Sequence, residues 1–130
     1  HDTMVRLRTE KVERIARDIP PLRVTGCEEG GKLLVVGWGS TNGAIDHAVS
    51  KVRRRGGDVS AVHLRHLNPL PQNLGEILQR FEKVLVPELN LGQLVLLLRA
   101  RYLVDAEGLN KVSGQPFKIR EIQEKIEEIL

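Results

Sequence analysis

Two hydrophobic periods alternate along the chain, and they predict strands and helices in turn. Residues 33–36 read Leu-Leu-Val-Val, a continuous apolar run typical of a strand that is covered on both faces. Apolar positions between 44 and 52 then recur on one helical face, and Gly56-Gly57 ends that helix. Ser40 or Thr41 is the expected N-cap of this helix. The segment therefore predicts a strand, a loop and a helix.

The same order of strand and helix returns twice more. The predicted pairs are strand 59–64 with helix 74–81, and strand 84–86 with helix 92–104. Pro87 interrupts the third strand, and the apolar run 94–98 predicts that the helix after it is well buried. Strands separated by helices call for parallel pairing through right-handed crossovers. We therefore expect a three-layer α/β sandwich.

The two ends of the chain carry helical patterns of their own. Residues 4–19 predict an amphipathic helix that ends at Pro20-Pro21, followed by a short extended stretch at 22–25. Near the other end, the Gly-rich connection that holds Val112 and residues 114–117 has room for one short strand, and 119–129 predicts a last amphipathic helix. We divide the chain into an N-terminal connector helix, 1–21, and one domain, 22–130.

Composition narrows the class of protein. A length of 130 residues suits a single core. The net charge of +3 and the four aromatic residues give neither a basic field nor a stacking platform, so we expect no nucleic-acid partner. Arg53, Arg54 and Arg55 are adjacent; we interpret them as a cationic helix C-terminus facing its own dipole, with phosphate binding as the alternative.

Cysteine content and apolar runs predict the compartment. The lone Cys27 can form no internal disulfide and cannot by itself hold zinc or an iron–sulfur cluster, which favours a reducing compartment. The longest apolar run has five residues, against the roughly 20 that a membrane-spanning helix needs. We expect a cytoplasmic protein with no membrane partner. The first residue is His1, with Met4 close behind, and we expect the chain to be a piece of a longer polypeptide.

The loop that follows the first strand resembles a dinucleotide-binding fingerprint without matching it. Its glycines stand at 37, 39 and 43, and Asn42 occupies the place of the last glycine in the fingerprint. No acid follows the second strand to bind a ribose. We expect Gly37 and Gly39 to permit a tight turn and Gly43 to let the helix approach the sheet.

Histidines and a serine invite two further hypotheses. His63 and His66 suit a metal, but side chains three apart on a strand point to opposite faces, which favours structural or interface histidines. Ser40, Asp46 and His47 supply the residue types of a hydrolase triad, yet Asp46 and His47 share one helix and the glycine spacing of a nucleophile elbow is missing. We expect neither a metal site nor nucleophilic catalysis.

Polar residues also follow the third strand. Glu88, Asn90 and Gln93 surround the start of the next predicted helix. They either bind polar groups of a partner through the helix N-terminus or cap and stiffen their own loop. The sequence leaves both interpretations open.

Four spaced segments together resemble one family. They are Gly-Trp-Gly-Ser-Thr-Asn-Gly at 37–43, Leu-Arg-His-Leu-Asn-Pro-Leu-Pro at 64–71, Val-Pro-Glu-Leu-Asn-Leu-Gly-Gln-Leu at 86–94, and Gly-Gln-Pro-Phe at 114–117. In this order they look like the C-terminal end of the α subunit of 2-oxoglutarate:ferredoxin oxidoreductase. The stretch that ends in Asp-Ile-Pro-Pro at 18–21 is similar to the connector before that domain, so the resemblance covers nearly the whole chain.

The resemblance implies a transketolase C-terminal-like fold, with a mixed, mostly parallel sheet of about five strands and one antiparallel edge strand. The implied parent enzyme converts 2-oxoglutarate to succinyl-CoA in the tricarboxylic acid cycle. It uses thiamine diphosphate, Mg, an iron–sulfur cluster and CoA, and it reduces ferredoxin. Its implied partners are the upstream domains of the same chain, the β subunit and, through the complex, ferredoxin.

We assign no catalytic residue, cofactor-binding residue or metal ligand to this chain, and expect it to act as a scaffold that is inactive alone. The expected interface residues lie in three strand-end loops: Ser40, Thr41, Asn42, Gly43, Asn68, Pro69, Glu88, Asn90 and Gln93. One alternative is a free-standing nucleotide- or CoA-binding module. Another is the same domain from a pyruvate or branched-chain 2-oxoacid oxidoreductase.

Overall fold

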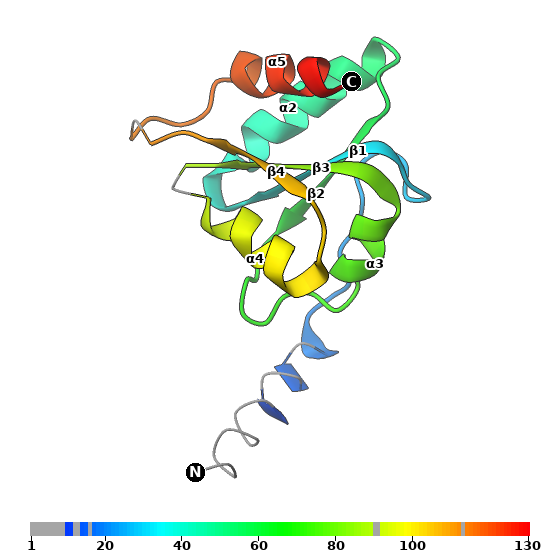
Figure 1. Cartoon of the computed structure of the whole chain (residues 1–130), viewed down its shortest axis with the longest axis vertical. Coiled ribbons are helices and arrows are strands. Elements are labelled where there is room, and N and C mark those ends of the chain that lie inside the picture. Colours follow the sequence, from blue (N-terminus) through cyan, green and yellow to red (C-terminus); the bar gives the residue numbers. More distant parts are fainter. Residues whose placement is uncertain (1–9, 12–13, 16, 90–91, 113) are drawn as a thin grey trace.

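A parallel sheet of four strands organises the domain (Figure 1). The computed structural model describes residues 10–11, 14–15, 17–89, 92–112 and 114–130. The strands run in the spatial order β2-β1-β3-β4, and every neighbouring pair is parallel. Their bounds are β1 Gly31–Trp38, β2 Val59–Leu64, β3 Phe81–Glu88 and β4 Ala106–Asn110.

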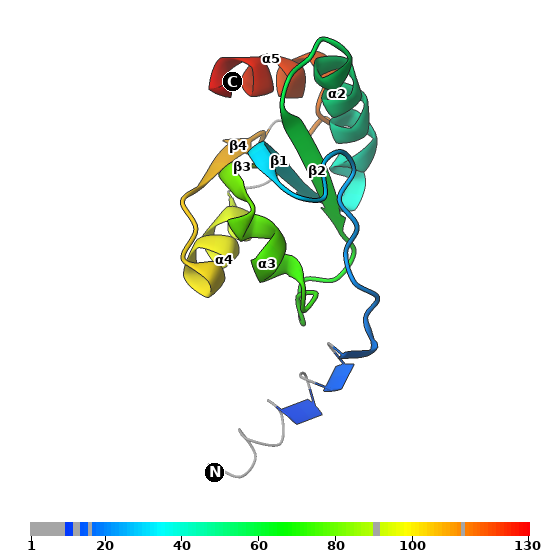
Figure 2. The same cartoon turned by 90° about the vertical axis from the view of Figure 1, so that its right-hand side faces the viewer.

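Helices cover both faces of the sheet, so the chain has the predicted three-layer α/β architecture (Figure 2). The helices α2 Asn42–Arg54 and α5 Ile119–Ile129 pack on one face. On the other face lie α3 Leu74–Gln79 and α4 Gln93–Tyr102. A 3-10 turn, η1 Gly39–Thr41, joins β1 to α2.

The apolar run of β1 lies between the two helical layers. Leu33 and Val35 belong to the core under α2 and α5, whereas Leu34 and Val36 belong to the core over α3 and α4. Successive side chains of a strand point to opposite faces, and here both faces are buried, so all four positions are apolar. This confirms the prediction of a buried central strand.

The sheet differs from the expectation in strand count and in direction. Among the described residues it has four strands rather than about five, and none of them is antiparallel. Antiparallel pairing is reduced to a single bridge between Thr25 and Ala61, on the outer edge of β2. Its two backbone hydrogen bonds measure 2.8 and 2.9 Å. The extended stretch predicted at 22–25 thus touches the sheet at one residue.

Two strand boundaries were wrong in the prediction. Phe81 begins β3 instead of ending the helix before it, and Pro87 lies inside β3 without interrupting it. Pro87 is tolerated because the register of β3 with β1 runs only to Leu85, so its missing N–H lies beyond that ladder. On its other side Pro87 still pairs with Leu109 of β4.

The last strand was also misplaced. We expected it near Val112 and 114–117, but β4 spans Ala106–Asn110. Its sequence, Ala-Glu-Gly-Leu-Asn, has little strand propensity, and only Ala106 in it is buried. Phe117, from the segment we favoured, instead fills the core under α2 and α5.

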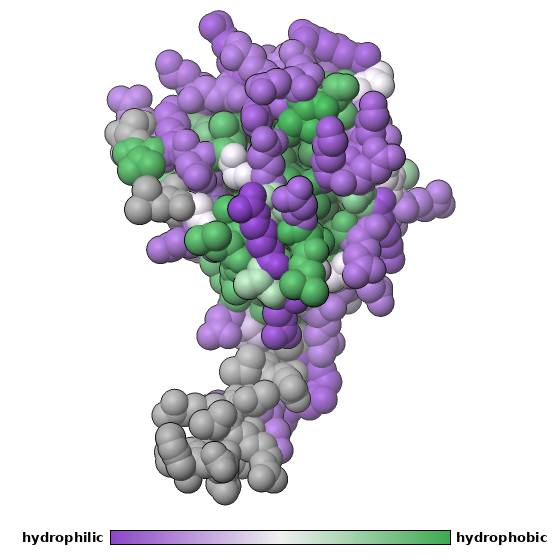
Figure 3. All heavy atoms as spheres, in the orientation of Figure 1, coloured by the Kyte–Doolittle hydropathy of each residue, from purple (hydrophilic) through white to green (hydrophobic). Residues whose placement is uncertain are grey.

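Helix α4 is less buried than its composition predicts. Leu94, Val95 and Leu98 face the core, but Leu96 is 60% exposed and Leu97 38% exposed. Figure 3 shows the resulting apolar surface over α4. Leu103 follows the helix in the left-handed conformation, with φ 56°, and is 90% exposed. The helix packs on the sheet from one side only, so half of its leucines face outward.

Residues before the domain fit the predicted connector helix as far as they are described. Residues 10–11, 14–15 and 17–18 are helical, and helical structure ends before Pro20. The domain boundary at residue 21 stays a prediction. No helix in the described part of the chain has the length and apolar character needed to cross a membrane.

Candidate functional site at the carboxyl edge of the sheet

The three loops predicted to form an interface lie at one edge of the sheet. They follow β1, β2 and β3, which are neighbours in space, and the carboxyl ends of parallel strands share an edge. Asn90, one of the predicted interface residues, lies outside the described residues. The interface role of the remaining residues stays a prediction.

The loop after β1 divides into a buried residue and exposed ones. Thr41 occupies the N-cap position of α2, as predicted for Ser40 or Thr41, but it makes no side-chain cap. It is buried, and its hydroxyl donates a 3.0 Å hydrogen bond to the carbonyl of Trp38. Ser40 and Gly43 are exposed, and Asn42 is half-buried. Thr41 therefore stiffens the loop, while its neighbours present the surface.

The glycines of this loop have different roles from those expected. A Cβ at Gly37 would collide with the Cδ1 of Ile45, so Gly37 is the residue that lets α2 approach the sheet. Gly39 makes the turn with φ +68°. Gly43, which we expected at the close approach, faces open space. Because the Ile45 side chain fills the space above Gly37, the first glycine serves helix packing.

Glu88 caps its own helix from inside the fold. Its side chain is 1% exposed. One carboxylate oxygen accepts a 2.7 Å hydrogen bond from the N–H of Leu94, and the other accepts a 3.1 Å bond from Val95. The N-cap residue Gly92 offers no side chain, and the charge of Glu88 meets the positive end of the dipole of α4. Of the two open interpretations, the structure gives Glu88 the capping one. Gln93 is exposed at the start of α4.

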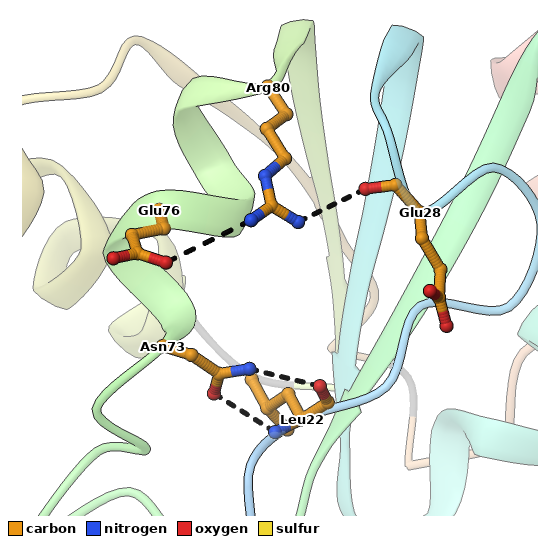
Figure 4. A network of polar contacts seen from close by, with 5 residues as sticks. All are labelled: Leu22, Glu28, Asn73, Glu76 and Arg80. Atoms are coloured by element: carbon orange, nitrogen blue, oxygen red, sulfur yellow. Dashed lines mark hydrogen bonds and ion pairs between the residues drawn. The ribbon is translucent and has the colours of Figure 1, made fainter.

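The loop after β2 holds Asn68, Pro69 and a contact that the sequence did not suggest. Asn68 is exposed and Pro69 half-buried, and the peptide bond between them is cis. Farther on, the side-chain amide of Asn73 donates to the carbonyl of Leu22 at 3.0 Å and accepts from its N–H at 2.9 Å (Figure 4). This pair attaches the extended stretch that follows the connector to the start of α3.

Arg80 adds a second contact to the segment before β1. Its guanidinium donates to the carbonyl of Glu28 at 3.1 Å and lies 3.9 Å from the carboxylate of Glu76 (Figure 4). Arg80 and Glu76 are mostly exposed, so we attribute little stability to the ion pair itself. The hydrogen bond to the carbonyl of Glu28 matters more for the structure, because it holds the turn that leads into the sheet.

His63 and His66 line the same cavity, although we expected them to point to opposite faces. The alternation rule fails here because β2 ends at Leu64 and His66 lies beyond it. Burial lowers the pKa of His63; Asp46 opposes this shift and Arg65 adds to it. In the described part of the chain, no three His, Cys, Asp or Glu side chains form a group suited to a metal ion.

The arginine cluster is engaged within the domain. Arg53 donates to the carbonyl of Val59 at 2.9 Å, and Arg54 donates to that of Ser50 at 3.3 Å. Arg55 pairs with Glu127 of α5 at 3.2 Å. These contacts favour the structural interpretation over a phosphate site.

The structure does not bring the residues of the hydrolase-triad hypothesis together within the described ranges. Asp46 and His47 are exposed neighbours on α2, and none of the hydrogen bonds found among the described residues links them to Ser40. Of the cofactors implied by the resemblance, the iron–sulfur cluster does not fit the residues of this chain by themselves. Cys27 is the only cysteine of the chain, whereas an iron–sulfur cluster needs several thiolates.

The parallel sheet between two helical layers, with polar loops at its carboxyl edge, defines an α/β domain class. Comparison with known sequences identifies the family within that class. Residues 31–122 match the family model for pyruvate:ferredoxin oxidoreductase core domain II, and the chain belongs to this family. It is 50% identical, over 94% of its length, to the 2-oxoglutarate oxidoreductase subunit KorA of Mycobacterium tuberculosis. It is also 30% identical, over 98% of its length, to the α subunit of 2-oxoacid:ferredoxin oxidoreductase 1 of Aeropyrum pernix.

Solved structures agree with this placement. The chain superposes with a TM-score of 0.92, at 27% identity, on 2-oxoglutarate:ferredoxin oxidoreductase from Magnetococcus marinus with 2-oxoglutarate, coenzyme A and succinyl-CoA bound. The match covers 99% of this chain and 23% of that one. A split-gene transketolase shares the fold at 20% identity, with a TM-score of 0.63. The chain spans only 18% and 21% of the two sequence relatives.

Proposed function

We propose that this chain is the assembly domain at the C-terminal end of the α subunit of a 2-oxoglutarate:ferredoxin oxidoreductase, and that it performs no bond breaking itself. The observation that carries the proposal is the 50% identity to a KorA subunit over nearly the whole chain. The superposition on an enzyme of the same substrate supports it.

The chemistry then belongs to the rest of the complex. Thiamine diphosphate with Mg, an iron–sulfur cluster and CoA supply oxidative decarboxylation to succinyl-CoA and electron transfer to ferredoxin, and the other domains and the β subunit hold them. We place the complex in the cytoplasm. This division suits a chain with one cysteine and a rigid three-layer core.

The assembly role falls to the exposed loops at the carboxyl edge. Ser40, Asn68 and Gln93 follow three adjacent strands, so they are held by the sheet in a fixed relative position. Buried contacts behind them, made by Thr41 and Glu88, keep the loops from rearranging. A stiff edge of this kind orients a neighbouring domain at low entropic cost.

The test is made in the complete α–β complex. Ser40→Arg and Asn68→Arg each place a bulky charge on the proposed interface, and Gln79→Arg places the same charge at the exposed end of α3 as a matched control. We expect the first two to weaken subunit association by about tenfold and to lower ferredoxin reduction in parallel. Unchanged association and activity in both, with normal folding, contradict the assembly role.

The identity of the 2-oxoacid requires a separate measurement. The family model is shared with pyruvate enzymes, so a pyruvate or branched-chain substrate is the alternative. Assays of the complete complex with each 2-oxoacid decide between them, and we expect preference for 2-oxoglutarate. The 130-residue chain alone is expected to decarboxylate none of them.

A further inference from the structure

A cavity of about 450 Å³ lies beside the carboxyl end of β2. Its walls come from the connector at 19–25, the first turns of α2, the end of β2 with the two residues beyond it, and Pro71. The volume falls in the range of small-molecule sites. The contact between Asn73 and Leu22 holds the connector wall in place. The cavity is therefore a built feature of the fold.

Polar side chains without internal partners line this cavity. They come from every wall except that of Pro71 and are Arg23, Asn42, Asp46, His63, Arg65 and His66. Within the part of the chain that the structure describes, no hydrogen bond or salt bridge engages any of these six side chains. Elsewhere in the domain, arginines such as Arg53 and Arg80 find backbone carbonyls. These side chains are therefore available to form hydrogen bonds with a ligand in the cavity.

His63 gives the cavity a directed donor. Its Nδ1 is buried without a hydrogen-bond partner and lies 3.7 Å from where a Cβ of Gly37 would be, so this nitrogen is enclosed between β1 and α2. Nε2 is then the nitrogen available to the cavity. A neutral imidazole carries one N–H, and a proton on Nδ1 would have no acceptor, whereas a proton on Nε2 can meet a ligand.

The charges around the cavity favour an anion. Arg23 and Arg65 contribute two cations against the single carboxylate of Asp46. Guanidinium groups present planar pairs of N–H donors that match carboxylate and phosphate oxygens. The amide of Asn42 and the Nε2–H of His63 add neutral donors. Donors outnumber acceptors, which is the pattern an oxyanion requires.

We propose that this cavity binds the carboxylate or phosphate group of a small molecule, held by Arg23, Arg65 and His63. The ligand group accepts hydrogen bonds from both arginines at the mouth and from the histidine at the inner wall. Asp46 selects against ligands whose second negative charge would lie beside α2. This site lies beside the proposed assembly surface and shares Asn42 with it, but it is tested by ligand binding rather than by subunit association.

Nuclear magnetic resonance titration of the 130-residue chain tests the site. Acetate and inorganic phosphate are the probes, with sodium chloride keeping the ionic strength constant, at about pH 8, where the imidazole is neutral. We expect saturable shifts of the His63 ring resonances with at least one probe. Saturation by acetate alone indicates a carboxylic acid, by phosphate alone a phosphate ester, and by both a general oxyanion site.

Variants make the result specific. Arg23→Gln and Arg65→Gln each remove one exposed guanidinium and are expected to weaken probe binding by about tenfold. Arg120→Gln on α5 is the matched control and should bind like the parent chain. His63→Asn tests the inner donor, and an unchanged backbone correlation spectrum verifies its fold. The proposal is overturned if neither probe saturates, or if Arg120→Gln weakens binding as much as the cavity variants do.

Discussion

The side chain of Asn73 makes both hydrogen bonds that the backbone of Leu22 can offer, one to its carbonyl and one from its N–H. The two residues are 51 positions apart, so this contact ties the extended stretch after the connector to the start of α3 (Figure 4). It also defines one wall of the cavity.

Replacing Asn73 by Ala removes both bonds. We expect the free energy of unfolding to fall by about 1–2 kcal/mol, because two half-buried hydrogen bonds are lost. Urea unfolding measures this change, and Gln72→Ala, at an exposed neighbour, is the control. Faster hydrogen exchange at the Leu22 amide should accompany the loss. Equal stability of the two variants would show that the contact does not hold the connector.

Glu88 is expected to be the most sensitive acidic residue of the sheet. Glu88→Ala leaves two N–H groups of α4 without an acceptor inside the fold, so we expect a loss of about 3 kcal/mol or more. Glu88→Gln keeps the shape but places an amide N–H₂ against backbone donors, and should lose somewhat less. Glu82→Ala, exposed on the same strand, is the control for chemical denaturation. A midpoint for Glu88→Ala equal to that of Glu82→Ala contradicts the buried cap.

Replacement by alanine should destabilise the fold at Gly37 and stabilise it at Gly43. Gly37→Ala forces its Cβ against Ile45 and is expected to cost about 1–3 kcal/mol. Gly43→Ala meets open space in the first turn of α2 and should stabilise the chain by about 0.4–1 kcal/mol, because alanine leaves the unfolded chain less conformational freedom.

A double mutant checks the cause. Ile45→Val removes the Cδ1 that the new Cβ would meet, so Gly37→Ala should cost less in that background than alone. Thermal unfolding of the four chains gives the coupling energy. Strict additivity would mean that the collision with Ile45 is not what excludes alanine.

His63 should make stability depend on pH near neutrality. Burial lowers its pKa below the ordinary value of 6.5. The carboxylate of Asp46 opposes this shift, and the charge of Arg65 adds to it. At a pH between the lowered pKa of His63 in the folded chain and its ordinary pKa in the unfolded chain, the unfolded chain binds more protons. The free energy of unfolding therefore falls as the pH drops below about 6.5. Titration of the ring resonances gives the pKa directly. We expect His63→Gln to flatten the stability profile in this window, and an unchanged slope would assign it to another group.

Leu103 carries backbone strain at the end of α4. A leucine with φ 56° is disfavoured, whereas glycine adopts this conformation freely at a helix C-terminus. Because the side chain is exposed, Leu103→Gly should raise the free energy of unfolding by about 0.5–1 kcal/mol. Leu103→Ala is the comparison that keeps a Cβ and removes the apolar side chain. If both variants gain equally, exposure rather than backbone conformation is responsible.

The architecture was predictable where local pattern and global position agree. The run at Leu33–Val36 has to be apolar on both faces, and this continuous apolar run predicted β1. β4 was misplaced because an edge strand with one buried residue, Ala106, carries little hydrophobic signal. Pro87 was wrongly predicted to interrupt β3. The strand tolerates it because the ladder with β1 stops before it, and this end point is not visible in the sequence.

In the candidate site too, local features could be predicted and long-range contacts could not. Thr41 was one of the two predicted N-caps and occupies that position, but its hydroxyl donates to the carbonyl of Trp38 instead of capping the helix. The capping role of Glu88 was one of two alternatives, because the direction of its carboxylate depends on the backbone turn at Gly92, with φ 85°. The contact between Asn73 and Leu22 has no local signal. Likewise, His63 and His66 share a cavity only because β2 stops between them.

The bridge between Thr25 and Ala61 gives the extended stretch after the connector a protective role. β2 is an outer strand of the sheet, and Thr25 occupies hydrogen-bonding groups on its free side. A protease that cut between Leu22 and Cys27 would release this cover and leave a bare strand edge, which invites pairing with a strand of another molecule. Nicked chains should therefore aggregate before they unfold.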